Sequence, residues 1–155
     1  MKGYKVFDPG FICRDYDFKV DGIAIGTTHV FDGEPVLCES GFHFCTELQD
    51  CFNYYIIKKN MVVCEVEAEG CTDAKDGCSK RSCKKLTIVR QLTLEEVIPF
   101  ITDSHFAYCW ALKFGNQDIM IDRITDPAIA HWWVSEFGNY DVMFERFPVL
   151  KEILS

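Results

Sequence analysis

The sequence lacks the long apolar runs that mark membrane and export segments. No stretch approaches the roughly 20 apolar residues that a membrane-spanning helix needs, and the N-terminal MKGYKVFDPG has no apolar core of the length of a signal peptide. We therefore expect a cytoplasmic protein that has no membrane partner.

Positive charge is also scarce. The 155 residues include 16 Lys and Arg against 24 Asp and Glu, which gives a formal net charge of −8. Because nucleic-acid binding draws on counterion release by basic residues, direct binding to DNA or RNA is not expected. An acidic surface suits a basic protein partner, although it is also ordinary for a soluble domain. The 48% hydrophobic and 14% aromatic content excludes a disordered chain.

Cysteine is abundant, but the sequence lacks the Cys-x-x-Cys knuckles typical of zinc sites. The nine cysteines are an odd number without an export signal, so we expect thiols or metal ligands rather than disulfides. Four of them are close enough in sequence to form an alternative zinc site, with buried or free thiols as the simpler reading. These are Cys64, Cys71, Cys78 and Cys83.

A tandem repeat is the clearest positive signal. Residues 101–123 read ITDSHFAYCWALKFGNQDIMIDR and residues 124–146 read ITDPAIAHWWVSEFGNYDVMFER, and the two align without gaps with 11 of 23 positions identical. A fixed period of this kind is typical of stacked helical units. The sequence therefore predicts a helical repeat region over 99–155.

Each copy contains residues typical of helix N-caps and C-caps. Asp103 and Asp126 stand where N-caps belong, and a Gly-Asn pair follows each apolar stripe, where a left-handed C-cap belongs. Asp118 and Asp141 are expected to cap a second, shorter helix. Such hairpins carry more aromatic surface than they can bury alone, which favours a protein partner. The candidate partner-binding residues are Trp110, Trp132, Trp133 and Tyr140.

Residues 1–98 read as an α/β module, which makes the whole chain α+β with a small mixed or antiparallel sheet. Alternation is strongest in the expected strand 61–68, and a Thr93–Glu96 capping box opens a short helix. A helix is expected from Thr46 to Tyr55. The other expected strands are 3–7, 13–20, 36–38, 42–45 and 86–92, with a polar loop over 70–85.

Two side chains and one loop of this module are candidates for ligand binding or catalysis. His43 lies between two phenylalanines and can stack on a base or exchange protons near neutral pH, or it is a structural histidine. Arg14 offers a planar fork for phosphate or carboxylate, or it forms a surface ion pair with Asp15 or Asp17. The basic loop 73–85 can grip a phosphate or an acidic patch, or it is a solvated loop.

The segments LCESGFHFC (37–45), NYY (53–55), EVEAEG (65–70) and LTLEE (92–96), with Cys13-Arg14 and the trailing repeats, resemble an uncharacterised domain of phage and prophage proteins. The resemblance covers nearly the whole chain. It implies a mobile-element accessory protein in the cytoplasm of a bacterial host, and it implies no activity.

A second resemblance is to the ADP-ribosyltransferase fold of the poly-ADP-ribose polymerase type. It is carried by the order of GFHFC, a helix that ends in Tyr55, and the strand CEVEAEG. It implies that His43 takes the place of the tyrosine that stacks on nicotinamide and that Lys5 lies near the NAD-binding histidine. The strand that should open with the catalytic glutamate is instead preceded by Lys84 and Lys85, which would repel a sugar cation.

The leading hypothesis is therefore an accessory protein that binds a host or antiviral-defence protein, with no cofactor and no catalysis. One alternative is an ADP-ribosyltransferase-like, NAD-consuming enzyme that works through His43. The other is a nucleotide sponge or sensor that uses the same cleft without chemistry. The ligand-binding candidates are Lys5, Arg14, His43 and Tyr55.

Overall fold

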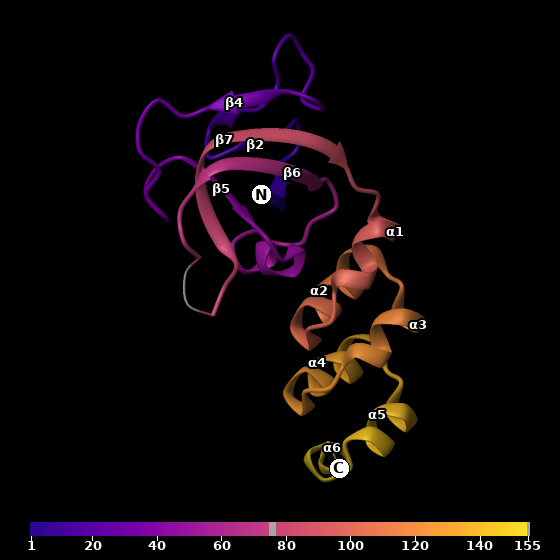
Figure 1. The fold of residues 1–155 in the computed structure, drawn as a ribbon. Helices are drawn as coiled ribbons and strands as arrows, with labels where there is room; N and C mark the ends of the chain where they lie inside the picture. The colour runs from indigo at the N-terminus through magenta and orange to yellow at the C-terminus, as the bar shows by residue number, and fades with distance from the viewer. Residues whose placement is uncertain (75–76, 155) are drawn as a thin grey trace. The chain divides into compact units, whose positions relative to one another are not determined.

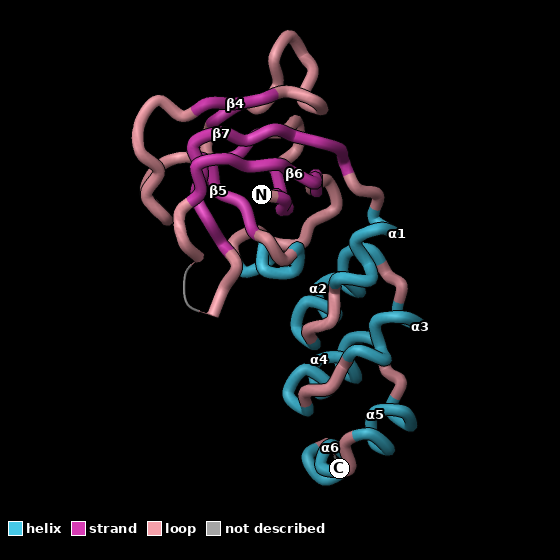
Figure 2. The backbone as a smooth tube through the Cα atoms, in the orientation of Figure 1, coloured by secondary structure: helices cyan, strands magenta, loops and turns pink. Residues whose placement is uncertain are grey.

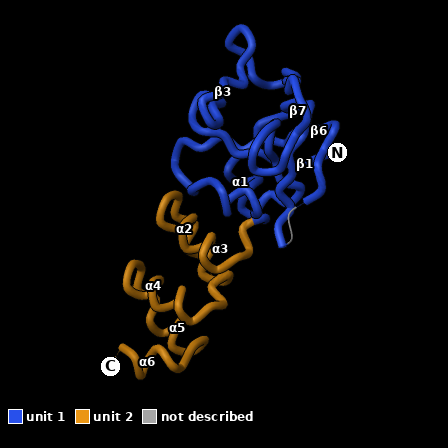
Figure 3. Tube along the Cα trace, turned by 90° about the vertical axis from the view of Figure 1, so that its left-hand side faces the viewer, with its two compact units in different colours: residues 1–100 blue, residues 101–155 orange. Residues whose placement is uncertain are grey.

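The computed structural model describes residues 1–74 and 77–154. The chain divides into two compact units, residues 1–100 and residues 101–155 (Figure 3), where the sequence analysis set the boundary between 98 and 99. Strands lie in the first unit and most helices in the second (Figure 2), so the α+β class is confirmed. No helix among the described residues has the length and apolar character needed to cross a membrane.

Unit 1 is built on antiparallel strands that close into a small barrel (Figure 1). β6 pairs with both β1 and β7, β7 pairs in turn with β5, and β5 returns to β1, while β4 extends the sheet from β7. β2 and β3 form a separate two-stranded hairpin. The bounds are β1 Lys2–Phe7, β2 Ile12–Cys13, β3 Tyr16–Asp17, β4 Thr28–Val30, β5 Phe42–Cys45, β6 Val62–Cys71 and β7 Lys80–Gln91.

The long β6–β7 hairpin follows the strongest alternation in the sequence. Along β6, Cys64, Val66 and Ala68 are buried, whereas Glu65 and Glu67 face partly outward. A register shift between Glu65 and Val66 bends the strand, as bulges do where a sheet closes. The buried side chains form one cluster with Phe7, Phe18, Phe42 and Phe44.

β7 begins at Lys80 rather than at Leu86, which corrects the loop expected over 70–85. The charged segment pairs with β5 and β6 along its length, and Lys80 and Ser82 are buried. The Arg81 guanidinium donates to the Thr72 carbonyl at 3.1 Å, which ties the turn together. Two residues of the expected basic loop, 75 and 76, lie outside the described residues.

Three other local expectations need correction. The strand expected over 13–20 is the tight β2–β3 hairpin, and 36–38 form a turn closed by the Val36–Ser40 bridge. The helix expected from Thr46 is a short 3-10 helix, η1 (Leu48–Asn53), with Glu47 at its N-cap. The capping box at Thr93 is confirmed in α1 (Leu94–Val97), which η2 (Ile98–Phe100) follows.

The barrel is almost open at one seam. β1 and β5 share a single register pair, Tyr4 with Cys45, while β1 stays paired to β6 through Phe7. At this junction a Cβ on Gly3 would lie 2.8 Å from the Cys45 carbonyl oxygen, so only glycine lets the strands meet. Beyond the junction the two strands diverge, and we call this opening the β1–β5 split.

In unit 2 the two sequence copies form matching elements. The first gives α2 (Ser104–Phe114), α3 (Gln117–Met120) and η3 (Ile121–Arg123). The second gives α4 (Pro127–Phe137) and α5 (Tyr140–Arg146), and α6 (Val149–Ile153) follows. The last arginine of each copy donates to the carbonyl of that copy's first residue, Arg123 to Ile101 at 2.8 Å and Arg146 to Ile124 at 3.0 Å.

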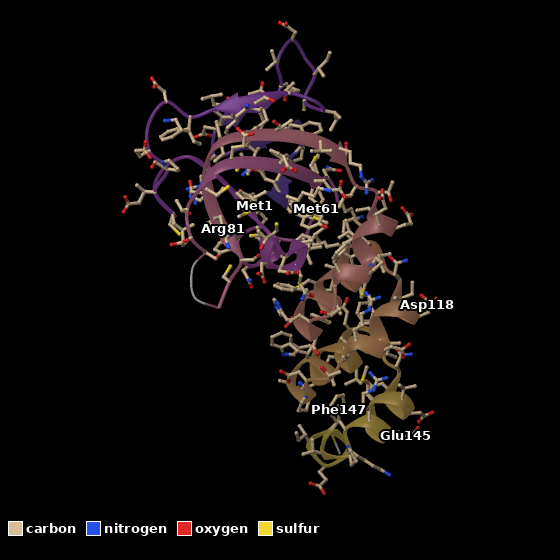
Figure 4. All side chains as sticks on the ribbon, viewed as in Figure 1. Met1, Met61, Arg81, Asp118, Glu145 and Phe147 are labelled. Atoms are coloured by element: carbon tan, nitrogen blue, oxygen red, sulfur yellow. The ribbon has the colours of Figure 1, made fainter. Side chains whose placement is uncertain are left out.

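The helix caps agree with the sequence analysis in part. Asp103 and Asp126 accept backbone N–H bonds at the N-caps of α2 and α4, and glycine ends both helices. Asp118 and Asp141 do not cap the second helices, because Asn116 and Asn139 occupy those positions with left-handed backbones. Asp118 lies in the first turn of α3 and points outward (Figure 4).

Two of the four partner-binding candidates are core residues, which corrects that expectation. Trp110 and Trp133 are 0% exposed. Their indole N–H groups donate to the Asn116 and Asn139 side chains at 3.1 and 3.0 Å, so each tryptophan fastens its helix to the turn that follows. Neither side chain is available to a partner while unit 2 is folded.

Candidate functional site

A cavity of about 660 Å³ opens inside unit 1 beside the β1–β5 split. Lys5 from β1, Arg14 from the β2–β3 turn, His43 from β5 and Tyr55 after η1 all line it. These are the four ligand-binding candidates of the sequence analysis, so the fold brings together side chains that are up to 50 positions apart. The volume lies in the range typical of small-molecule sites.

Aromatic rings form much of the cavity wall. Tyr16, Phe18 and Phe42 contact one another edge to face, with ring centroids 4.6 to 5.4 Å apart. Tyr16 is held further by a 2.9 Å hydrogen bond between its hydroxyl and His29. The other phenylalanine and tyrosine residues in the lining are Tyr4, Phe31, Phe44, Tyr54 and Tyr55. A wall of this kind suits a planar ring.

Lys5 is a buried cation without a carboxylate partner among the described residues. Its side chain is 2% exposed, and its ammonium donates to the His43 carbonyl at 2.5 Å across the β1–β5 split. The ammonium also lies 5.6 Å from the Phe7 ring and 5.5 Å from the Phe18 ring. An ammonium has three donors, and the one carbonyl leaves most of its hydrogen-bonding capacity unused.

Lys80 is a second cation of this kind, at the start of β7. It is 6% exposed, lies 4.0 Å from the Tyr54 ring and reaches the Cys38 sulfur at 3.8 Å. No ion pair with a carboxylate forms at Lys80 within residues 1–74 and 77–154. A buried charge without a counterion is costly, so two such lysines in one cavity point to an anionic ligand.

Arg14 reaches the cavity from a strained turn. The β2–β3 hairpin pairs Cys13 with Tyr16, which leaves Arg14 and Asp15 as its two-residue loop, with φ of 48° and 66°. Such turns favour asparagine and glycine, and neither is present. The Cys13 sulfur is hydrogen-bonded to the Tyr55 hydroxyl at 2.8 Å, which anchors the hairpin to the cavity wall.

His43 is neutral and has a defined tautomer. Its Nε2 accepts the Cys38 backbone N–H at 3.0 Å, so the proton lies on Nδ1. Burial, together with the positive charges of Lys80, Lys5 and Arg14, lowers the pKa of His43 from 6.5 to about 4. The imidazole therefore offers a hydrogen-bond donor and no charge at neutral pH.

Carboxylates line the cavity only near its rim. Asp8 is half-exposed and forms a 2.6 Å ion pair with Lys58, while Asp32 and Glu39 are exposed. The lysines expected at the glutamate position of a transferase, Lys84 and Lys85, do not line the cavity. Both are exposed, and they lie 3.9 Å from Glu34 and 3.5 Å from Glu69, respectively.

Two thiols lie at the inner wall, where Cys45 and Cys51 are both buried. A hydrogen bond from Cys51 lowers the pKa of Cys45, while the same bond and burial raise that of Cys51. Both are free thiols. The pair adds polarisable surface to a wall that is otherwise aromatic.

The four cysteines of the alternative zinc site are not gathered at one point. Cys71 faces Cys83 across the β6–β7 hairpin, whereas Cys64 pairs with Gln91 at the hairpin's other end, about 20 Å away along the strand. Cys78 contacts the Tyr54 hydroxyl at 3.0 Å. Burial raises the pKa of Cys64 and of Cys83 to about 12. Within the described residues no group of three or more metal-ligating side chains is placed to hold an ion.

The sequence analysis missed Tyr54, and it placed Lys80 in the basic loop 73–85 rather than in a strand. That loop was expected either to grip a phosphate or an acidic patch or to be solvated. The only strand signal there is the alternation of Lys80 and Ser82 with Arg81, and the β5 residues that pair with the first two lie 35 and 39 positions earlier.

Residues 1–99 match the model of a family described as a domain of unknown function, DUF7666. No curated protein and no solved structure matches the chain.

Replacing Lys5 with methionine is expected to raise the free energy of unfolding of the unliganded protein by roughly 1–2 kcal/mol. Lys5→Met loses the hydrogen bond to the His43 carbonyl, but the cost of a buried ammonium without a counterion is expected to exceed the contribution of that one bond. Because all three tryptophans lie in unit 2, urea unfolding should be followed by circular dichroism and by hydrogen exchange of the β1 amides. The control is Lys58→Met, which breaks an exposed ion pair and should cost no more than about 1 kcal/mol. A loss of stability in Lys5→Met larger than that in the control would contradict this account of Lys5.

The neutral His43 predicts acid sensitivity. Between its unfolded pKa of 6.5 and its folded pKa of about 4, the unfolded chain binds a proton that the folded chain does not. Lowering the pH through this window therefore favours unfolding. The wild type should lose stability more steeply than His43→Gln from pH 6.5 to pH 4, as measured by urea unfolding. His29, whose pKa burial also lowers, is present in both proteins and cancels. An NMR titration that finds the His43 imidazole titrating near pH 6.5 would refute the prediction.

Proposed function

The chain belongs to the DUF7666 family, and we propose that its N-terminal domain binds a small anionic nucleotide in the cavity and holds it without turnover. The protein acts as a nucleotide sponge or sensor. The resemblance to phage and prophage domains supports an accessory role in the cytoplasm of a bacterial host, where removing or reporting a signalling nucleotide is a useful activity for a mobile element.

One observation carries the proposal: Lys5 and Lys80 are both buried at the cavity and neither has a carboxylate partner among the described residues. In a chain with a net charge of −8, counter-charges are plentiful, so acidic side chains could have neutralised both lysines. In the proposal, an anionic ligand supplies the negative charge that no carboxylate of the described residues provides at Lys5 and Lys80. Phosphate oxygens suit this role because ammonium groups bind them readily as point charges.

The wall of the cavity supports an aromatic portion in the ligand. Tyr16 and Phe42 present ring edges and faces at one side of the cavity, and stacking of a base on such rings contributes about 1–3 kcal/mol. The neutral His43 adds an Nδ1–H donor that can bond an acceptor on the base or the sugar. Together these features favour a nucleotide over an inorganic anion.

Turnover is not part of the proposal, because ADP-ribosyl transfer needs a carboxylate beside the sugar that develops positive charge. Lys5, Lys80 and Arg14 would raise the energy of that cation. Of the three acidic residues at the rim, Asp8 is already paired with Lys58. The ADP-ribosyltransferase-like enzyme therefore remains the alternative outcome of the test below.

Isothermal titration with ribonucleoside monophosphates, diphosphates and NAD is expected to find saturable binding of at least one nucleotide. Lys80→Met should weaken that binding by tenfold or more, and the control variant Lys85→Met, at an exposed lysine of the same strand that does not line the cavity, should leave it within about twofold. Incubation with NAD should release no nicotinamide. Release that disappears in His43→Gln would replace the sponge with the enzyme. Absence of binding for the whole panel would refute the proposal.

A second candidate function rests on a partly exposed cluster in unit 2, the aromatic face, defined as His105, Tyr108, Trp132 and Phe137, of which His105 and Trp132 are exposed and the other two half-buried. Trp132 is 46% exposed, and its ring lies 5.9 Å from Tyr108 and 6.2 Å from His105. Exposed tryptophan and tyrosine are typical of the centres of protein interfaces. This face supports binding to a host or antiviral-defence protein. Tyr140, the remaining candidate, packs on Phe144 instead.

Capture of a host protein from bacterial lysate should be lost in Trp132→Ala, because truncating a central tryptophan removes much of the binding energy of an interface. Tyr140→Ala serves as the control, since that ring is 50% exposed but lies outside the aromatic face. A partner that both variants capture equally well would contradict a role for the aromatic face.

A further inference from the structure

The two buried lysines occupy different places around β5. Lys80 is paired with Cys45, and directly paired residues of antiparallel strands point to the same face. Lys5 lies one position after the Tyr4–Cys45 pair, so its side chain leaves β1 on the opposite face. It bends into the β1–β5 split to reach the His43 carbonyl.

The hydrogen-bond and cation–π partners of the two ammonium groups agree with this difference. Lys5 contacts Phe7, Phe18 and the His43 carbonyl, whereas Lys80 contacts Tyr54 and Cys38. Both charges still act on the His43 imidazole. His43 lies between the two, since its carbonyl accepts from Lys5 and its ring is held by the backbone N–H of Cys38, whose sulfur contacts Lys80.

A ligand that neutralises both ammonium groups while each keeps these contacts has to present negative charge at two different places. A ligand with two phosphoryl groups can do so with one group at each lysine, so that neither lysine stays buried without a counter-charge, which is costly. Arg14 does not need a counter-charge from the ligand, because the residue is exposed and water can solvate its guanidinium.

We infer that the cavity selects nucleotides with two phosphoryl groups, a nucleoside diphosphate rather than a monophosphate, with one group at Lys5 and the other at Lys80. This inference rests on the proposed function and specifies its ligand class. The Nδ1–H of His43, between the lysines, donates to an oxygen that bridges the two subsites. The aromatic wall then receives the base.

The test compares a monophosphate with the diphosphate of the same base by isothermal titration, with adenosine, AMP, ADP and inorganic pyrophosphate as the first set and the other bases after it. The wild type should bind the diphosphate at least tenfold more tightly than the monophosphate. In Lys5→Met and in Lys80→Met the advantage of the diphosphate should fall below about threefold, because one phosphoryl subsite is lost in each. In Lys85→Met, at an exposed lysine outside the cavity, it should persist.

The outcomes separate this inference from the proposed function. Equal affinity of the wild type for the two nucleotides would overturn the two-phosphoryl inference and leave nucleotide binding intact. An advantage that survives in both lysine variants would overturn it as well. Absence of binding for every member of the set, pyrophosphate included, would overturn both. Circular dichroism of each variant, matched to the wild type, ensures that a lost advantage reflects the lost charge rather than misfolding.

Discussion

The hydrogen bond from the Lys5 ammonium to the His43 carbonyl is the contact on which the site depends. β1 and β5 meet at only one register pair, so β5 carbonyls that face the split beyond it have no partner on β1, and the seam of the barrel stays open. The lysine crosses this seam and satisfies one carbonyl. It does so with a charge that the surrounding aromatic rings stabilise only weakly. The same residue therefore closes the barrel and makes its interior positive.

A positive interior inside an acidic chain has consequences for chemistry as well as for binding. Lys80, Lys5 and Arg14 lower the pKa of His43, which removes it as a proton donor near neutral pH and leaves it as a neutral hydrogen-bond donor. They also disfavour any reaction that builds positive charge on a substrate. The arrangement suits the holding of an anion and opposes the formation of a glycosyl cation.

The features that the sequence predicted correctly depend on residues close together in the chain, and those that it missed depend on residues far apart in the chain. The caps at Asp103, Asp126 and Thr93 are set within four residues, and local composition was enough to find them. Lys80 pairs with Cys45, which lies 35 positions earlier, and no local pattern encodes that partner. Trp110 was misplaced on the surface for a related reason: the helix stripe predicts a buried face but does not reveal that Asn116 satisfies the indole N–H inside the unit.

A protein that carries two uncompensated lysines in its core is less stable empty than full. Ligand binding to the folded state alone adds stability by mass action, about 2.7 kcal/mol at a ligand concentration one hundred times the dissociation constant. In the proposed function, the free energy that the fold gives up at Lys5 and Lys80 is recovered when an anionic ligand binds. The stability of unit 1 would then itself report the ligand, as the proposed sensor role requires.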